Sequence, residues 1–238
     1  MKTILHKSNT RGFANHGWLK SHHTFSFASY QNAKRMNFGA LRVLNDDVVQ
    51  PKMGFGTHPH QNMEIISIPL QGALSHKDSM GNKRAIEVGE IQVMSAGTGL
   101  THSEFNDSKT DEVNFLQLWI FPEKLNIEPN YNQRLFPLEG KKNQLQTVVA
   151  PKDKLEDNAL PINQQAYIYR TNLDSETSVN LKVKLQQNGF YVFVVEGEIQ
   201  IDNTSLGKRD ALGVYETENI QIKANQSSEV IIIEVPMN

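Results

Sequence analysis

Short hydrophobic runs separated by turn residues dominate this chain. Leu116, Leu118 and Ile120 alternate with other residues, and a period of two is typical of a β-strand with one buried face. Long stretches with the 3.6-residue hydrophobic period of an amphipathic helix are hard to find. The pattern therefore predicts an all-β fold. Comparable runs occupy residues 39–44, 63–70, 180–185, 189–195, 198–201 and 229–235.

The pattern divides into two halves of similar character. A chain of 238 residues is long enough for two β-barrels of roughly 100 to 120 residues each. Residues 122–143 contain three prolines with Asn, Glu and Lys, a composition typical of a linker on the surface. A short internal repeat favours a duplication, since residues 69–72 (PLQG) and 194–197 (VVEG) each close an apolar strand with a glycine. We expect one domain in residues 1–138 and a second in residues 139–238.

Composition excludes several kinds of site and partner. The chain has no cysteine, so disulfides and thiolate ligands are excluded, and a metal would have to bind His, Asp or Glu. The 24 basic and 26 acidic residues nearly balance, so a nucleic-acid partner is not expected. The longest apolar run, residues 190–195, is far shorter than the roughly 18 residues of a membrane span. Residues 1–7 lack the apolar core of a secretion signal, and we expect a monomeric cytoplasmic protein.

Two pairs of metal-binding residue types share one spacing. His58 and His60 are two residues apart, and because side chains alternate along a strand, both project from the same face. His102 and Glu104 repeat this spacing further along the chain. On neighbouring strands the two pairs would form a site of three histidines and one carboxylate, with positions left for water, substrate or dioxygen. Glu64 has the same parity as His58 and His60 on a regular strand, so spacing alone does not choose between Glu64 and Glu104.

The histidines are distributed unevenly. All eight lie at or before His102, and the following 136 residues contain none. If the halves are related, only the first has kept a metal site, and we expect the second to be metal-free. We interpret His76, beside the turn at residues 78–82, as a hairpin histidine, and His6 as an exposed one. Packing and hydrogen bonding account for the others, which are His16, His22 and His23.

Two stretches around these residues resemble the two motifs of the cupin superfamily. Residues 54–64 (GFGTHPHQNME), followed by Gly72, resemble the first motif. Gly89 and residues 97–106 (GTGLTHSEFN) resemble the second, with glycine at position 97 where many cupins have proline, and with a longer gap after Gly89. The resemblance implies a cupin, or jelly-roll, barrel in the first half of the chain.

Four motifs carry a closer resemblance, namely residues 57–60 (THPH), 76–82 (HKDSMGN), 94–99 (MSAGTG) and 102–104 (HSE). They resemble the pirin family, and residues 11–18 (RGFANHGW), 23–27 (HTFSF) and 41–47 (LRVLNDD) resemble its bacterial quercetinase-like branch. The resemblance extends over roughly residues 1–135. It implies two tandem cupin barrels, a metal site in the first and a degenerate second barrel that has lost its ligands. It also implies that the carboxylate ligand is Glu104, whereas the general cupin pattern points to Glu64, which we keep as a residue that orients a ligand or as an alternative ligand.

The resemblance implies a function as well. It indicates a metal-dependent dioxygenase similar to quercetin 2,3-dioxygenase, which cleaves flavonols with O2 and releases carbon monoxide. His58, His60, His102 and Glu104 would bind one divalent transition metal ion, expected to be Fe, although the same ligands accept Ni, Co, Cu, Mn or Zn. Glu104 would also act as the catalytic general base.

Two other functions remain open at this point. The main alternative is a metal- or redox-sensing regulator of the pirin type that binds a protein partner. A cupin isomerase fits the ligands equally well but not the closer motifs. Metal-dependent loss of flavonol absorbance would support the dioxygenase, and partner capture that depends on the oxidation state of iron would support the regulator.

Overall fold

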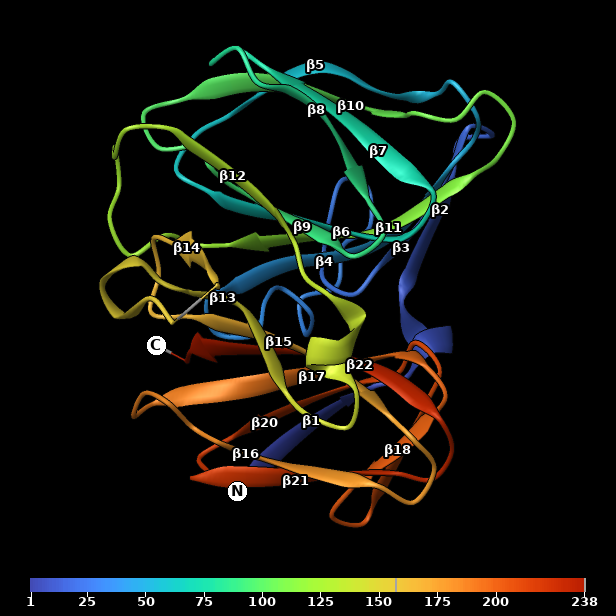
Figure 1. The fold of residues 1–238 in the computed structure, drawn as a ribbon, viewed down its shortest axis with the longest axis vertical. Coiled ribbons are helices and arrows are strands. Elements are labelled where there is room, and N and C mark those ends of the chain that lie inside the picture. Colours follow the sequence, from blue (N-terminus) through green and yellow to red (C-terminus); the bar gives the residue numbers. More distant parts are fainter. Residues whose placement is uncertain (157, 238) are drawn as a thin grey trace.

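Strands account for nearly all the regular structure of this chain. The computed structural model describes residues 1–156 and 158–237, and in Figure 1 four sheets follow one another along the long axis, in the order small, large, large and small. This arrangement confirms the predicted all-β fold of two tandem cupin barrels. The helical segments within the described residues are single 3-10 turns, namely η1 (Ser8–Thr10), η2 (Leu138–Lys141) and η3 (Lys152–Lys154).

The N-terminal barrel consists of one large and one small antiparallel sheet. Its large sheet has the order β12 (Asn130–Leu135), β9 (Glu90–Ser95), β6 (Glu64–Gln71), β11 (Val113–Ile120), β4 (Leu41–Val49), β3 (Leu19–His23) and β2 (Gly12–Asn15). Its small sheet has the order β5 (Gly54–His60), β10 (Leu100–Asn106), β7 (Ala73–Asp78) and β8 (Lys83–Glu87). The expected surface linker at residues 122–143 is therefore only partly a linker, because β12 lies within it and pairs with β9.

The C-terminal barrel repeats this design, except that one pair of strands is parallel. Its large sheet has the order β1 (Lys2–His6), β20 (Ala211–Tyr215), β17 (Asn188–Glu196), β22 (Ser228–Pro236), β15 (Tyr167–Leu173), β13 (Gln146–Pro151) and β14 (Leu160–Ile162). The parallel pair is β13 with β14. Its small sheet has the order β16 (Ser178–Lys182), β21 (Asn219–Ala224), β18 (Glu198–Ile201) and β19 (Thr204–Gly207). The glycines of the internal repeat occupy equivalent turns with positive φ, Gly72 (73°) between β6 and β7 and Gly197 (87°) between β17 and β18.

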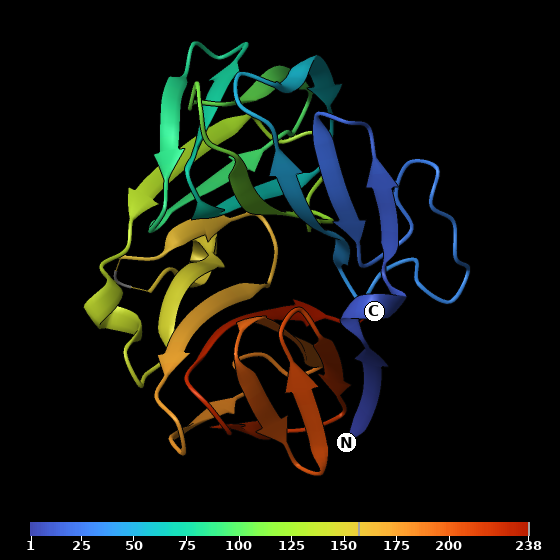
Figure 2. The same ribbon diagram turned by 90° about the vertical axis from the view of Figure 1, so that its right-hand side faces the viewer.

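Strand β1 belongs to the N-terminal part of the sequence and to the C-terminal barrel of the fold. It is made of residues 2–6 but pairs antiparallel with β20, in the edge position that β12 holds in the first barrel. Figure 2 shows this N-terminal strand beside the C-terminal barrel. The domain boundary expected after residue 138 lies within η2. Strand β1 does not follow this boundary, because it pairs with a strand of the C-terminal barrel. His6 was expected to be exposed, which is wrong: it is buried at the end of β1, opposite Ala211 of β20, and its Nδ1 lies 2.7 Å from the Tyr191 hydroxyl oxygen.

The apolar residues form three kinds of core. The outer faces of the two large sheets pack against each other through residues such as Leu116, Leu118 and Ile231, and this cluster joins the barrels. A second large cluster fills the C-terminal barrel, where Phe190 and Val192 are fully buried. The clusters inside the N-terminal barrel are small and lie apart, which leaves its interior open to polar side chains. They comprise Leu19, Val49, Leu74, Ile86, Val113 and Phe115 in one, and Ile65, Met94, Ala96 and Leu100 in the other.

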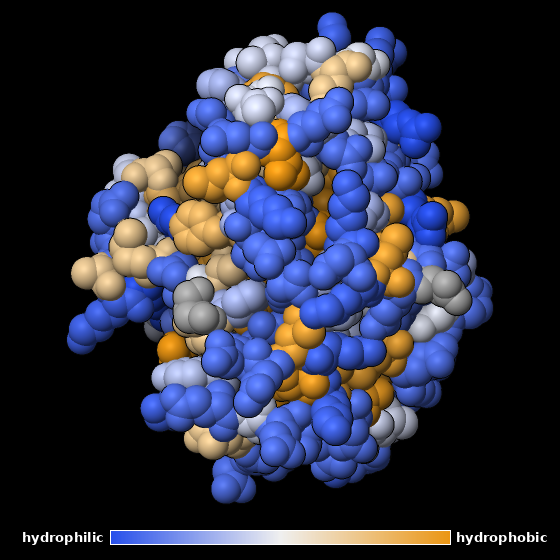
Figure 3. Space-filling model, turned by 90° about the vertical axis from the view of Figure 1, so that its left-hand side faces the viewer, coloured by the Kyte–Doolittle hydropathy of each residue, from blue (hydrophilic) through white to orange (hydrophobic). Residues whose placement is uncertain are grey.

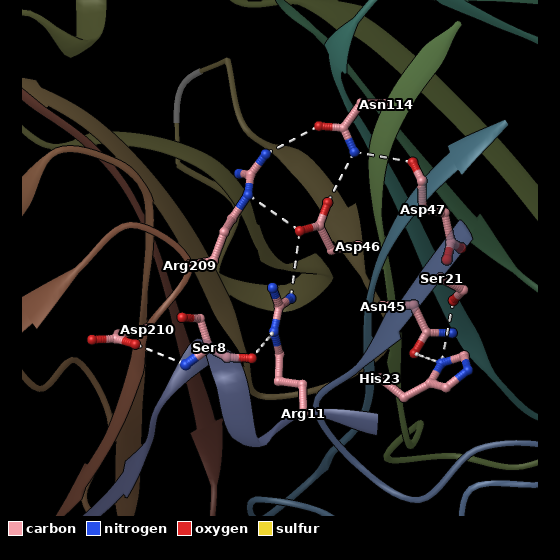
Figure 4. A network of polar contacts seen from close by, with 10 residues as sticks. All are labelled: Ser8, Arg11, Ser21, His23, Asn45, Asp46, Asp47, Asn114, Arg209 and Asp210. Atoms are coloured by element: carbon pink, nitrogen blue, oxygen red, sulfur yellow. Dashed lines mark hydrogen bonds and ion pairs between the residues drawn. The ribbon is translucent and has the colours of Figure 1, made fainter. Parts of the chain in front are cut away.

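A buried ion network also joins the two barrels (Figure 4). The Asp46 carboxylate on β4 accepts hydrogen bonds from Arg11 Nη1 at 3.4 Å and Asn114 Nδ2 at 2.9 Å. Arg209 of the C-terminal barrel places its Nε 3.2 Å from Asp46 Oδ2 and donates from Nη2 to Asn114 Oδ1 at 3.1 Å. Asp46 is buried and the two arginines are partly buried, and each charge is paired, as a low-dielectric interface requires.

The outer surface follows from the same alternation of side chains. On the face shown in Figure 3, hydrophilic residues predominate and hydrophobic ones form separate small groups. This is the pattern expected of strands whose apolar positions turn inward. Within the described residues, the helical segments are too short and too polar to span a membrane.

Candidate metal centre

Three histidines meet where β5 pairs with β10. His58 and His60 project from the same face of β5, and His102 lies directly opposite His58 in the antiparallel register. The ring centroids of His102 are 4.5 Å from His58 and 4.8 Å from His60, and those of His58 and His60 are 4.9 Å apart. One ligand nitrogen from each ring lies within 4.8 Å of the other two, a spacing that one metal ion can bridge.

The nitrogen atoms of this cluster fit a bound metal ion. His58 Nδ1 lies 2.8 Å from the Gly56 carbonyl oxygen, so Nδ1 carries the proton and donates, and Nε2 keeps its lone pair. His60 Nε2 and both ring nitrogens of His102 are buried without a hydrogen-bond partner among the described residues. Buried polar atoms normally have a partner, and a cation would provide one for His60 Nε2 and for one ring nitrogen of His102.

Burial also keeps two of these rings in the form that binds metal. It is the largest cause of a lowered pKa at His60, to about 4, and at His102, to about 2, with further lowering by the neighbouring histidines. Both imidazoles are therefore neutral at pH 7, and a neutral imidazole is the ligand form.

Glu104 lies on the same strand as His102 and is fully buried. Ser67 Oγ lies 3.2 Å from Glu104 Oε1, and Gln117 Nε2 donates to Oε2 at 3.5 Å. Desolvation by burial raises the pKa of Glu104 to about 7, while these two hydrogen bonds oppose the shift. Glu104 forms a second group with His102 and His76, whose ligand atoms also lie within 4.8 Å of one another. A carboxyl group poised near neutral pH beside metal-binding nitrogens suits both ligation and proton transfer.

An apolar pocket of about 370 Å³ opens against this cluster. Its volume is within the range of small-molecule sites. Phe55 enters it from β5 because the β5–β10 register shifts by one residue between His102 and Glu104. Trp119 forms part of the wall, with its ring centroid 4.9 Å from that of His60. The pocket is lined by Ala14, His16, Leu19, Ser21, His23, Phe27, Ala28, Ser29, Asn45, Asp47, Phe55, His58, His60, Glu104, Phe115, Gln117 and Trp119.

Comparison with known proteins gives the family. Residues 5–120 match the Pirin model, and residues 147–235 match the model of the quercetinase C-terminal cupin domain. The chain is 43% identical over 234 residues to the quercetin 2,3-dioxygenase of Escherichia coli (strain K12), covering 98% of each chain. This chain belongs to the pirin family. It is also 35% identical over 223 residues to a pirin-like protein of Caulobacter vibrioides, covering 94% of this chain and 95% of the relative.

The fold agrees with that of a solved pirin. The crystal structure of the bacterial pirin YhhW from Escherichia coli in complex with nickel(II) superposes with a TM-score of 0.93 at 40% identity, and all of both chains is covered. Both groups of side chains that could hold a metal ion, among the described residues of the present pirin, lie in its N-terminal barrel.

His76 lies closer to the metal-binding residues of this pirin than its sequence position suggested. It is on the β7–β8 hairpin as expected, but its ring points into the barrel, with its centroid 5.4 Å from that of His102. Its Nε2 lies 3.1 Å from Asp78 Oδ2, whose carboxylate also accepts from the backbone of Met80 and Asn82. The hairpin interpretation identified the element and missed the direction of the side chain.

Glu64 lies at the junction of the two barrels of the pirin fold. Its Oε2 accepts hydrogen bonds from Ser95 Oγ at 2.8 Å and from the backbone N–H of Asn163 at 3.1 Å. The argument from parity assumed one regular strand, but β5 ends at His60 and β6 begins at Glu64. The intervening residues turn the chain, with Asn62 at a φ of 51°. Neither group of metal-binding side chains includes Glu64, so Glu104 is the stronger candidate for the carboxylate ligand.

Sequence reasoning missed the polar residues of the pocket. Asn45 and Asp47 line it from β4, and Ser21 and His23 line it from β3. A signal was present: Asn45 and Asp47 alternate with Asp46 in a strand that is otherwise apolar at its inward positions. Polar residues at two successive inward positions of a buried strand indicate a site rather than a core.

Proposed function

We propose that this pirin is a metal-dependent dioxygenase that cleaves flavonols with O2, in the manner of a quercetin 2,3-dioxygenase. One observation carries the proposal: three histidines form one cluster, His60 and His102 have buried nitrogens without a partner among the described residues, and His58 and His60 line an aromatic-walled pocket of about 370 Å³. The name of the Escherichia coli relative supports the reaction type. The size and aromatic walls of the pocket favour a flat aromatic substrate.

His58, His60, His102 and Glu104 would hold one divalent transition metal ion. Iron is the expected ion, and the nickel(II) complex of the related pirin indicates that nickel is also compatible with this fold. When bound, the ion would act as a Lewis acid that favours the ionised form of a substrate hydroxyl and would support the reaction with O2.

The protein would provide the base and the orientation. Glu104, with its pKa near 7, would accept the proton of the flavonol hydroxyl that approaches the metal ligands. Ser67 and Gln117 would fix the carboxylate through the hydrogen bonds described above. Phe27, Phe115 and Trp119 would hold the aromatic rings and exclude water from the reacting atoms.

The test is anaerobic purification with elemental analysis, followed by addition of quercetin and then O2. The proposal requires loss of flavonol absorbance that depends on both metal and O2, and release of carbon monoxide. If the metal-loaded protein binds its ion but leaves flavonols intact, the dioxygenase proposal is wrong and the regulator alternative takes precedence. Partner capture that depends on the oxidation state of iron would then test that alternative.

A further inference from the structure

Two walls of the N-terminal barrel face each other across the pocket. The small sheet contributes His58, His60 and Glu104. The large sheet contributes alternate residues of three adjacent strands, because its inward side chains recur with a period of two. These inward residues are Ser21 and His23 on β3, Asn45 and Asp47 on β4, and Phe115 and Gln117 on β11.

The strand register arranges these residues in two rows. His23, Asn45 and Gln117 are successive cross-strand neighbours, and Gln117 extends this row to Glu104. Ser21, Asp47 and Phe115 form the next row in the same way. The first row therefore lies at the metal-binding carboxylate, and the second lies one step further along β4.

Asp47 is the polar side chain of this wall with unused hydrogen-bonding capacity. It is 4% exposed, and its Oδ1 has no hydrogen-bond partner among the described residues. Asn45, by contrast, has its Oδ1 3.1 Å from His23 Nδ1. Burial is the largest cause of a pKa raised to about 7 at Asp47, and a hydrogen bond with Ser21 offsets only part of this cost of burying the carboxylate. A ligand that donates a hydrogen bond to Oδ1 would offset that cost.

The neighbouring Asp46 differs from Asp47 because its carboxylate has charged and hydrogen-bonding partners. It points away from the pocket and is held by Arg11, Arg209 and Asn114 (Figure 4). Figure 4 shows Asp47 on the other side of β4, close to Ser21. The strand thus uses one aspartate to join the barrels and directs the next one into an apolar pocket.

We propose that Asp47 accepts a hydrogen bond from a ring hydroxyl of the bound aromatic substrate, at a subsite distinct from the metal-binding residues. The inference rests on the proposed function, since it concerns the substrate of that site. Asp47 thereby selects polyhydroxylated aromatic ligands, because a ring that carries hydrogen or a methoxy group at this position has no proton to donate.

The experiment compares two flavonols that share the 3-hydroxyl and 4-keto groups. Quercetin carries further ring hydroxyls, and 3-hydroxyflavone carries none. Their dissociation constants are measured without O2 by quenching of tryptophan fluorescence, with the metal-loaded and the metal-free protein, because Trp119 lines the pocket. We expect wild type to bind quercetin about tenfold more tightly or better, the usual effect of a hydrogen bond to a charged group.

Asp47→Leu removes the acceptor and is nearly isosteric. It should weaken quercetin binding by about tenfold or more while changing 3-hydroxyflavone binding by less than about threefold. Asp47→Asn retains an acceptor oxygen and should lose less, so it tests the proposal if the leucine variant does not fold. Asp46→Asn is the matched control, a buried aspartate of the same strand that faces away from the pocket, and should leave the ratio of the two constants unchanged.

The outcomes separate this inference from the proposed function. Equal binding of both flavonols by wild type, or equal weakening of both by Asp47→Leu, overturns the subsite. If the protein turns over quercetin but the ratio of the two dissociation constants does not depend on Asp47, the subsite alone is overturned. Selective binding that depends on Asp47, without any turnover, supports the subsite and overturns the dioxygenase.

Discussion

His102 lies directly opposite His58 in the β5–β10 pair, and their ring centroids are 4.5 Å apart. Residues opposite each other in an antiparallel pair lie on the same face, so the register of two strands brings together ligands that are far apart in sequence. A shift of one residue in this pairing would turn one ring out of the barrel. The geometry of the candidate metal centre therefore depends on the register of these two strands.

Removal of a ligand histidine should remove the metal. His58→Ala or His60→Ala each takes away one nitrogen, and we expect the metal content after purification and dialysis to fall by about tenfold or more. Elemental analysis makes the measurement. His22→Ala is the control, since His22 packs on Phe13 with ring centroids 4.8 Å apart and is not among the clustered ligands. Full occupancy in both ligand variants would contradict the assignment.

The two buried glutamates should behave differently when changed to glutamine. Glu104→Gln removes the anionic ligand and base, so metal retention should weaken and flavonol turnover should fall by about 10² or more. Glu64→Gln alters hydrogen bonds at the junction of the barrels and should reduce stability by about 1 to 3 kcal/mol while leaving the metal in place. Metal content, initial rates with added iron and urea denaturation separate the effects. The reverse pattern would identify Glu64 as the ligand.

Metal affinity should depend on pH through Glu104. Its pKa, raised to about 7, leaves the carboxyl protonated below neutrality, whereas His60 and His102 are already neutral there. Binding should therefore release a proton from Glu104, and affinity should rise up to tenfold per pH unit until about pH 7 and then level off. Glu104→Gln should abolish this part of the proton release. Calorimetry in buffers of different ionisation enthalpy measures it, and an identical release in the variant would refute the role.

The C-terminal barrel should contain no transition metal. Residues 139–238 have neither His nor Cys, and the interior of this barrel is filled by apolar residues such as Phe190 and Val192. We expect one ion per chain after loading with excess metal and desalting. Two ions per chain, one of them located in the C-terminal barrel, would contradict this expectation.

Loss of Arg209 at the barrel junction should destabilise the whole chain. Arg209→Met leaves the buried Asp46 with one charged partner instead of two. Breaking a fully buried pair costs about 3 to 5 kcal/mol, and we expect a loss up to the lower end of this range because Arg209 is partly exposed. Urea denaturation should show this loss as a lower midpoint. Metal content should be unchanged, since Arg209 does not line the pocket. A midpoint equal to that of wild type would show that Arg11 alone compensates Asp46.

The sequence was sufficient where a pattern repeats locally. Alternation of apolar residues predicted the strands, and the spacing of His58, His60 and His102 predicted their common face. The duplication was also visible, since the glycine turns at Gly72 and Gly197 occupy equivalent places. Each of these features depends on neighbours along the chain or on one strand.

The failures concern contacts that only the complete fold defines. The parity argument for Glu64 assumed one regular strand, whereas the chain turns between β5 and β6. The directions of His6 and His76 depend on partners in distant strands. Asp47 was missed because its significance comes from the opposite wall of the barrel. Local periodicity predicts the face of the strand on which a residue lies. It does not predict which residues of distant strands pack against that face.

The position of β1 has a consequence for the order of folding. Residues 2–6 leave the ribosome long before Ala211–Tyr215, with which they pair, so the earliest strand must remain without its partner during most of synthesis. A contact between residues this far apart in sequence forms slowly, because a long loop must close first. The N-terminal barrel, with its candidate metal centre, lies between β1 and β20 in the sequence. It can therefore fold before β1 pairs with β20. We therefore expect the pairing of β1 with β20 to be a late step of folding that links the two barrels.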